Sequence, residues 1–464
     1  MSMPLSSPNP IFAMNCFRAH VRHFPFAMVL TLAIAAFASA QDTRIAPRVQ
    51  RSTVAGIDLL VLETRVRDVV TLRGSLPAGD AAAQPGNVAV ATLAGEMLDQ
   101  GTTSQDKFAI AEQLEAVGAT VDFSVGNDVL NISAKCLRKD VPLVVSLIAE
   151  QLRQPAFDPE DFKRLKVRLA GAIQRQLEST DLRAMETFHQ TIYPTGHPNR
   201  AATVRDFLAA IETATLDDVK AFHREHYGPR GLVLVFVGDV DPAATRSAIE
   251  QGFSGWQGGS NVVRANAPAT ASAGGARTQT VPMADKSSVS VVLGQATGLK
   301  HSDPASLPLR IGTAILGSGF TGRLMATIRD REGLTYGIGA TLTNDTFNDG
   351  EWRIVATFAP QLLERGLAST RRELEAWHKT GVTAQELAER KTNLAGTFKL
   401  QLATTEGLAA TLLQTVQRGY PLSWIDEYPD QVQSLTLEQV NATIRKHLDP
   451  AKMVLIRAGT VSAD

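Results

Sequence analysis

The sequence is poor in cysteine, with two in 464 residues. Cys16 lies in an N-terminal segment that we expect to be removed on export, and a mature chain left with Cys136 alone cannot form an internal disulfide. Cys136 lies in the strand-like run LNISAKCL, where no neighbouring residue marks it as a nucleophile. We therefore predict a structural thiol at this position.

An excess of charge of either sign is also missing. The chain has 46 Lys and Arg against 47 Asp and Glu, a formal net charge of −1. This balance gives no electrostatic reason to expect nucleic acid as a partner. A hydrophobic content of 44% and a charged content of 20% are typical of a globular protein, and the length favours two or more domains.

Long apolar runs are absent except at the N-terminus. Two arginines precede the run at residues 24–37, and the small-residue sequence Ala-Ser-Ala ends at Ala40. The run is short for a membrane span, which needs about 20 apolar residues. We predict a cleaved signal peptide at residues 1–40, a periplasmic protein and no stable membrane span; an uncleaved anchor is the alternative. A start at Met14 would give a more usual signal length.

The second part of the chain repeats the first. Residues 215–240 align without gaps on residues 436–461, and the same offset brings GATV at 118–121 onto GATL at 339–342. Two matches in one register predict two homologous domains. The identical positions in the first copy are Thr215, Leu216, Val219, Ala221, Arg224, His226, Pro229, Val233, Leu234, Gly238 and Val240.

A segment without apolar periodicity separates the repeats. Residues 255–280 are rich in Gly, Ala, Ser and Asn, which is typical of a flexible linker. We place the first domain at 43–256, the linker at 257–277 and the second domain at 278–464. Predicted strands and helices occur in groups, which predicts an α+β fold: each domain is an antiparallel sheet with helices packed on one face.

Several segments resemble the pitrilysin/insulinase-like (M16) metallopeptidases. The most specific is RLMATIRDREGLTYGIGA at 323–340; EMLDQGT at 96–102, GHP at 196–198, the duplication and the linker support it. The resemblance covers nearly all of the mature chain. It implies two homologous α+β domains that face each other around a chamber.

The resemblance also shows what the first domain lacks. Active relatives carry H-x-x-E-H on a helix, where two histidines bind zinc and the glutamate activates a water. Here Thr92, Gly95 and Glu96 stand at these positions, and the third ligand falls near 170–172, in the sequence Ala-Gly-Ala. We therefore expect no metal and no cofactor on this chain. The nearest alternative, His223 to His226, has the wrong spacing and predicts structural histidines.

The second domain keeps the residues that the family contributes to catalysis from this side. Arg329 and Tyr336 match the family's arginine and tyrosine, whose donors stabilise an oxyanion or hold the substrate backbone. Their sequence spacing lets them converge across the turn at Gly333. Arg323 and Arg331 are the local competitors, and the glycines 317, 319 and 322 predict a tight turn with positive φ.

These observations favour one function and leave others open. The expected function is the non-zinc subunit of a heteromeric M16-type peptidase, in which Arg329 and Tyr336 act in trans on a peptide held at the zinc of a partner subunit. The first alternative is a non-catalytic peptide-binding or structural core-type protein, and the second is a peptidase active alone through an unrecognised site. Without the H-x-x-E-H motif, we expect no peptidase activity from this chain alone.

Overall fold

The computed structural model describes residues 44–266 and 276–461. From Ile45 onward the described residues form one compact unit. The predicted signal peptide with Cys16, and residues 267–275 of the predicted linker, lie outside the described residues. In the part that is described, no helix is both long and apolar enough for a membrane crossing.

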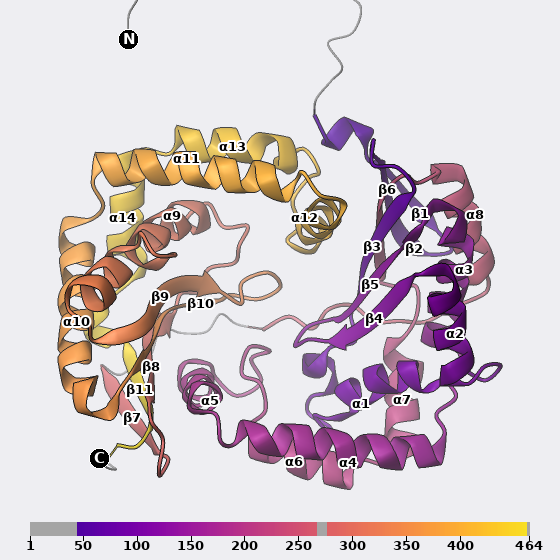
Figure 1. The fold of residues 1–464 in the computed structure, drawn as a ribbon, viewed down its shortest axis with the longest axis horizontal. Coiled ribbons are helices and arrows are strands. Elements are labelled where there is room, and N and C mark those ends of the chain that lie inside the picture. Colours follow the sequence, from indigo (N-terminus) through magenta and orange to yellow (C-terminus); the bar gives the residue numbers. More distant parts are fainter. Residues whose placement is uncertain (1–43, 267–275, 462–464) are drawn as a thin grey trace, which may run out of the picture. The chain divides into compact units, whose positions relative to one another are not determined.

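The first half of the molecule is built on a sheet of six strands within the described residues (Figure 1). Its strands have the spatial order β1-β2-β6-β3-β5-β4. The elements are β1 (Gln50–Val54), β2 (Ile57–Glu63), β3 (Val69–Leu76), α1 (Val90–Met97), α2 (Lys107–Val117), β4 (Thr120–Val125), β5 (Leu130–Leu137), α3 (Val141–Arg153), α4 (Pro159–Gln176), α5 (Thr180–Ile192), α6 (Val204–Thr213), α7 (Leu216–His226), β6 (Val233–Gly238) and α8 (Pro242–Gly252).

The second half is built on a sheet of five strands in the described part of the chain, in the order β7-β11-β8-β10-β9. Its elements are β7 (Arg277–Pro282), β8 (Val289–Ala296), α9 (Ser306–Gly317), a π-helix (Met325–Arg331), β9 (Thr335–Thr343), β10 (Glu351–Phe358), α10 (Leu363–Thr380), α11 (Ala384–Gln401), α12 (Thr405–Gln417), α13 (Trp424–Ser434), α14 (Leu437–His447) and β11 (Val454–Gly459).

The repeat in the sequence is also a repeat in the structure. The order β2-β6-β3-β5-β4 of the first sheet corresponds to the whole second sheet, and β1 is an additional edge strand. The aligned sequence windows fall on α7 and β6 in one half and on α14 and β11 in the other. Both helices begin with a capping box, formed by Thr215 with Asp218 and by Thr436 with Gln439, because both keep the Thr at the N-cap.

The predicted α+β class with two sheets is confirmed, and the strand pairing adds a detail. Each sheet is antiparallel except for one parallel pair, β2 with β6 and β7 with β11. Parallel neighbours need a long crossover connection. Here the connection contains most of the helices of the half, so the closing strand returns beside the opening one.

Each half contributes one helix that packs on the sheet of the other half, and each sheet is therefore covered on both faces. Helix α12 packs on the first sheet, where Leu412 lies in one buried cluster with Leu60 and Val235. Helix α5 packs on the second sheet, where Phe188 clusters with Val292. The sequence analysis predicted helices on one face of each sheet only. It missed the second layer because the helix that covers the other face comes from a distant segment of the chain. Every residue of β8 is buried as a result.

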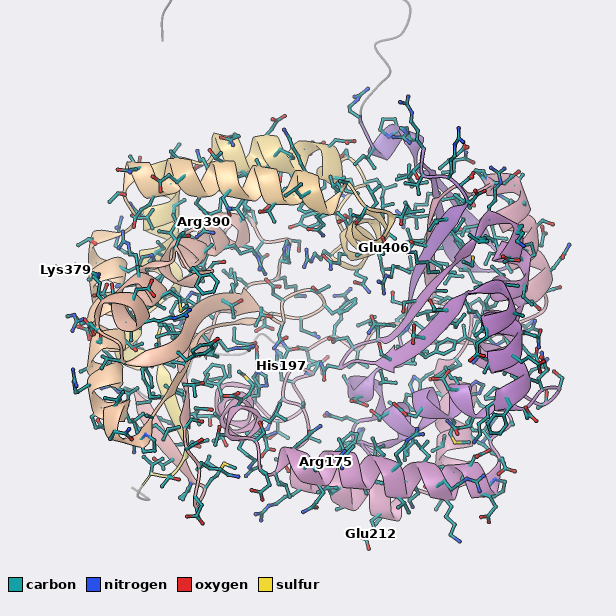
Figure 2. The ribbon with its side chains drawn as sticks, in the orientation of Figure 1. Arg175, His197, Glu212, Lys379, Arg390 and Glu406 are labelled. Atoms are coloured by element: carbon teal, nitrogen blue, oxygen red, sulfur yellow. The ribbon has the colours of Figure 1, made fainter. Side chains whose placement is uncertain are left out.

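Polar contacts also join the two halves. The Glu351 carboxylate is completely buried, lies 3.1 Å from His189 Nε2 and accepts a hydrogen bond from the Tyr193 hydroxyl. His197, labelled in Figure 2, belongs to the GHP sequence, and its Nε2 lies 3.1 Å from Asp349 Oδ1. These histidines have no sequence neighbours that mark them, and the structure shows them as contacts between the halves.

The described part of the predicted linker is held against the protein. The Ser260 hydroxyl donates a 2.9 Å hydrogen bond to the Pro77 carbonyl, and Arg264 donates one of 2.6 Å to the Phe347 carbonyl. Residues 257–266 therefore run from contacts with the first half to contacts with the β9–β10 connection of the second.

Candidate functional site

The segment from α9 to β9 positions Arg329 and Tyr336. Helix α9 ends at Gly317, a turn follows, and the π-helix Met325–Arg331 leads through Gly333 into β9. Among the three glycines of the turn, Gly319 alone has a positive φ, of 68°. The prediction of positive φ is wrong for Gly317 and Gly322. At Gly317 a Cβ would lie 2.4 Å from the Ala340 backbone nitrogen, so this glycine allows the helix and strand to approach closely.

The guanidinium of Arg329 lies between two aromatic rings. Its Cζ is 5.1 Å from the ring centre of Tyr336 and 5.2 Å from that of Phe320. The expected convergence of Arg329 and Tyr336 is therefore what the structure shows. Each such contact at an exposed place stabilises the arrangement by about 0.5–1 kcal/mol, which orients the arginine without burying it.

Tyr336 is directed outward by an irregularity in the strand. Thr357 of β10 pairs with Gly337 and Phe358 pairs with Thr335, so Tyr336 is the extra residue of a β-bulge. The Thr335 hydroxyl fixes the bulge with a 2.6 Å hydrogen bond to the Thr357 carbonyl. Bulges reorient side chains and are frequent next to active sites. Tyr336 is 86% exposed on an edge strand, and its ring is available to a partner molecule.

The neighbouring arginines are engaged elsewhere. Arg323 makes two 2.6 Å hydrogen bonds to the carboxylate of Glu386 and one of 3.0 Å to the Gly381 carbonyl. Its guanidinium holds the pKa of Glu386 at about 2, well below the ordinary value. Arg331 donates to the Thr327 hydroxyl of its own helix. Of the three arginines, Arg329 therefore remains the one directed at Tyr336.

In the first half, Thr92 stands where the resemblance to the family predicts the first zinc-binding histidine, and it is paired with Asp80. The Thr92 hydroxyl donates a 2.8 Å hydrogen bond to Asp80 Oδ1. Burial raises the pKa of Asp80 to about 6, although the hydrogen bond from Thr92 opposes the shift. This pair lines a cavity of about 260 Å³ between α1, α4 and α6.

The other two positions on α1 differ in their surroundings. A Cβ at Gly95 would lie 2.3 Å from Val125 Cγ2, so the side chain of Val125 fills the volume that a catalytic glutamate would need. The Glu96 carboxylate pairs at 3.1 Å with Arg168 of α4. Ala170, Gly171 and Ala172 on the same helix have no side chain that could bind a metal.

The side chains around α1 therefore do not fit zinc. Among the described residues, no group of three or more His, Cys, Asp or Glu side chains is arranged to share a metal ion. Asp99 lies near the end of α1, and burial raises its pKa to about 6 with help from the negative charges of Glu96 and Asp122. No step of a reaction can be assigned to a metal held by these residues.

The remaining candidates have structural surroundings. His223 is buried, with Nε2 2.8 Å from the Leu152 carbonyl, and His226 lies 3.0 Å from the Ser260 hydroxyl. Cys136 is buried in β5, and burial raises the pKa of its thiol to about 11, which keeps it protonated and unreactive.

Sequence reasoning missed two partners in the site. Phe320 follows the positive-φ glycine and is 72% exposed, and an exposed aromatic cannot be told from a core residue by sequence alone. Asp80 begins a short 3-10 helix (Asp80–Ala83) twelve residues before Thr92, and no motif connects the two. The extra residue of the β-bulge gave no sequence signal beyond the glycines that flank the strand start.

Comparisons with known proteins agree with the repeat. Residues 60–202 match the family model described as insulinase (peptidase family M16), and residues 213–394 match the model described as the peptidase M16 inactive domain. A Helicobacter pylori protein named "non-peptidase homolog YmxG" is 21% identical over 91% of this chain and 95% of its own length. A Streptomyces coelicolor protein named an uncharacterized zinc protease is 23% identical over 75% of this chain and 76% of its own.

Solved structures share the fold. A peptidase M16 inactive domain from Pseudomonas fluorescens has a TM-score of 0.80 and 27% sequence identity, covering 90% of this chain and 98% of that one. A structure described as a protease from Helicobacter pylori has a TM-score of 0.78 and 17% identity, covering 88% of this chain and 99% of that one.

Proposed function

Because the chain belongs to the M16 family of insulinase-like proteins, we propose that it is the non-zinc subunit of a two-chain peptidase. The partner would be an exported M16 relative with an intact H-x-x-E-H motif, which would supply the zinc and the general base. This chain would bind no cofactor itself. The predicted signal peptide supports a shared location in the periplasm.

One observation supports the proposal: the α1 positions lack zinc-binding side chains, whereas the Arg329–Tyr336 pair is present. At the expected positions for zinc and base, Thr92 is hydrogen-bonded to Asp80, Val125 fills the space above Gly95, and Glu96 pairs with Arg168. Arg329 and Tyr336 lie together, and Tyr336 is exposed on an edge strand. A chain that had lost all function would have no reason to keep the second arrangement while losing the first.

The chemistry available to this chain is donation of hydrogen bonds. The Tyr336 hydroxyl and the Arg329 guanidinium would bind the carbonyl oxygen of the scissile peptide as negative charge develops on it. Loss of one such donor costs about 3 kcal/mol of transition-state stabilisation in other enzymes. The rings of Phe320 and Tyr336 would hold the guanidinium in place for this contact.

The test is reconstitution with a zinc-bearing relative, ideally the product of an adjacent gene. We expect peptide cleavage from the mixture, and a loss of about 100-fold or more when Arg329→Ala and Tyr336→Phe are combined. Arg331→Ala is the matched control, because this arginine is close in sequence but bonds to Thr327 of its own helix. Cleavage that persists at full rate with the double variant would refute the proposed role.

A second candidate function is a non-catalytic peptide-binding or structural protein. The exposed rings of Phe320 and Tyr336 favour it, because they offer an apolar contact surface without any zinc. The same purified chain distinguishes the two functions. A chain that binds peptide alone, and adds nothing to the cleavage rate of any zinc-bearing relative, has the second function.

A further inference from the structure

The second half contains a cavity of about 630 Å³ between α9, α11, α12 and α13. It is the counterpart of the smaller cavity beside Thr92. In the repeat, α9, α11 and α13 take the places that α1, α4 and α6 take in the first half. The smaller cavity has Asp80 as its one charged lining residue among those described, whereas the larger one is lined by arginine and aromatic side chains.

One wall of the larger cavity is a continuous series of aromatic rings. Tyr420 and Trp424 stack with their centres 4.9 Å apart and an angle of 7° between the rings. Tyr428 lies 4.9 Å from Trp424, and Phe398 lies 4.6 Å from Tyr428. Aromatic residues make up 6% of the chain, so four of them on one cavity wall form an unusual concentration. A wall of this kind suits a flat or bulky apolar group.

The cavity also has a cation with unused donors. The Arg418 side chain makes one hydrogen bond within the described part of the chain, from Nε to the Thr346 hydroxyl at 3.5 Å. Its terminal nitrogens are therefore available to a ligand. Arg310, the second arginine, is already bonded to the Leu342 carbonyl at 2.9 Å and to the Asp345 carboxylate. Burial, together with the charge of Arg310, lowers the pKa of Arg418.

The other titratable groups at the cavity limit the charge of the ligand. Asp303 lines the cavity and accepts a 2.6 Å hydrogen bond from the Lys300 backbone. His301 is neutral, because burial and the two arginines lower its pKa to about 3. With one arginine paired to Asp345 and a carboxylate at Asp303, the site suits a single negative charge better than a phosphate.

We propose that this cavity binds a ligand that joins an aromatic group to a carboxylate, with the ring against the aromatic wall and the carboxylate on Arg418. Two sources have this chemistry: the C-terminal residue of a peptide and a free aromatic acid. The inference does not depend on the proposed function, because none of its residues belongs to the Arg329–Tyr336 pair. A failure here would leave the reconstitution test unaffected.

The experiment is calorimetric titration of the full mature chain with three probes. They are a hexapeptide of five alanines ending in phenylalanine, the same peptide with an amidated C-terminus, and 3-phenylpropanoate. We expect the free peptide to bind at least about tenfold more tightly than its amide, since a charge-assisted pair to Arg418 is lost. Binding of 3-phenylpropanoate with no binding of the peptide would assign the site to free acids.

Two variants locate the binding. Arg418→Gln removes the cation, and Gln414→Glu places a competing carboxylate one turn before Arg418 at an exposed position, where folding is not at risk. Each should weaken binding by about tenfold or more, while Arg365→Gln, an exposed arginine of α10, should leave it unchanged. Equal binding of peptide and amide, or full binding by both cavity variants, would overturn the proposal.

Discussion

Helix α1 in the first half and the π-helix in the second have different electrostatic surroundings. Beside α1, burial raises the pKa values of Asp80 and Asp99 to about 6. Beside the π-helix, Arg323 lowers the pKa of Glu386 to about 2. The carboxylates of Asp80 and Asp99 are therefore held at a cost to stability, whereas the Glu386 carboxylate contributes to it.

This contrast supports our proposal that Arg329 and Tyr336, rather than the positions on α1, carry the function. On α1, the residues at the expected ligand positions form internal pairs or leave their space to a neighbouring side chain. Around the π-helix, a strong ion pair supports the segment while Arg329 and Tyr336 stay at the surface. A structural element that is stabilised in order to present exposed donors is typical of a binding site.

The largest effect is expected from rebuilding the zinc motif with Thr92→His, Gly95→Glu and Glu96→His. The Glu side chain would collide with Val125, and Asp80 would lose its hydrogen bond from Thr92. The free energy of unfolding should fall by about 3–5 kcal/mol in urea denaturation.

A matched variant tests the cause of this loss. Adding Val125→Ala to the rebuilt motif should recover part of the lost stability, because it opens the volume above Gly95. Zinc retention after dialysis should remain low, since Ala170, Gly171 and Ala172 offer no third ligand. A rebuilt protein that unfolds at the wild-type urea concentration and keeps one zinc would contradict our description of α1.

Asp80→Asn should stabilise the protein at alkaline pH. The folded pKa of about 6 lies above the value of the unfolded chain, so the folded state binds the proton more tightly. Stability of the wild type therefore falls as pH rises from about 4 to 6 and stays low above that range. The variant should gain about 2 kcal/mol at pH 8 and nothing at pH 4 in urea denaturation.

The control for Asp80 is Thr92→Val, which removes the donor and should lower stability above pH 6, where the carboxylate is charged. Asp99 keeps its own pH dependence in both variants. The slope of stability against pH should therefore shrink without vanishing in Asp80→Asn, and it should steepen in Thr92→Val, where the pKa of Asp80 rises further. If Asp80→Asn has the same free energy of unfolding as the wild type at pH 8, burial of the charged Asp80 carboxylate does not destabilise the protein.

Arg323→Gln should lower the free energy of unfolding, by less than Asp80→Asn raises it. Because the folded pKa of Glu386 is depressed, the pair stabilises the protein above the unfolded value and loses this contribution as pH falls through about 2. The pair is partly exposed, so we expect a loss of about 1–2 kcal/mol at pH 7. Thermal unfolding should show no such loss for Arg331→Gln, and equal losses would contradict the distinction between the two arginines.

The sequence predicted the features that depend on local pattern or on the repeat. The α+β class and the paired elements α7 and α14 follow from such patterns. The convergence of Arg329 and Tyr336 followed from their spacing around Gly333.

Contacts between distant segments could not be predicted in the same way. The exchange of α5 and α12 depends on which sheet face lacks its own helices, and a single amphipathic pattern does not identify the sheet that it covers. The Asp80–Thr92 pair and the cavity near Arg418 have the same origin, since each joins side chains from elements that meet only in the folded chain.

The smallest effect on stability is expected where we place the function. Tyr336→Phe removes a hydroxyl from a side chain that is 86% exposed. Arg329→Gln removes a charge that contacts two surface rings and lies 3.9 Å from the Asp330 carboxylate. Tyr336→Phe should alter the free energy of unfolding by less than about 0.5 kcal/mol in urea denaturation, and Arg329→Gln, which loses two cation–π contacts, by about 1 kcal/mol at most, against about 1–2 kcal/mol for Arg323→Gln. A larger loss would mean that these residues are needed for folding, and their survival in the sequence would then no longer argue for a role at a partner's zinc.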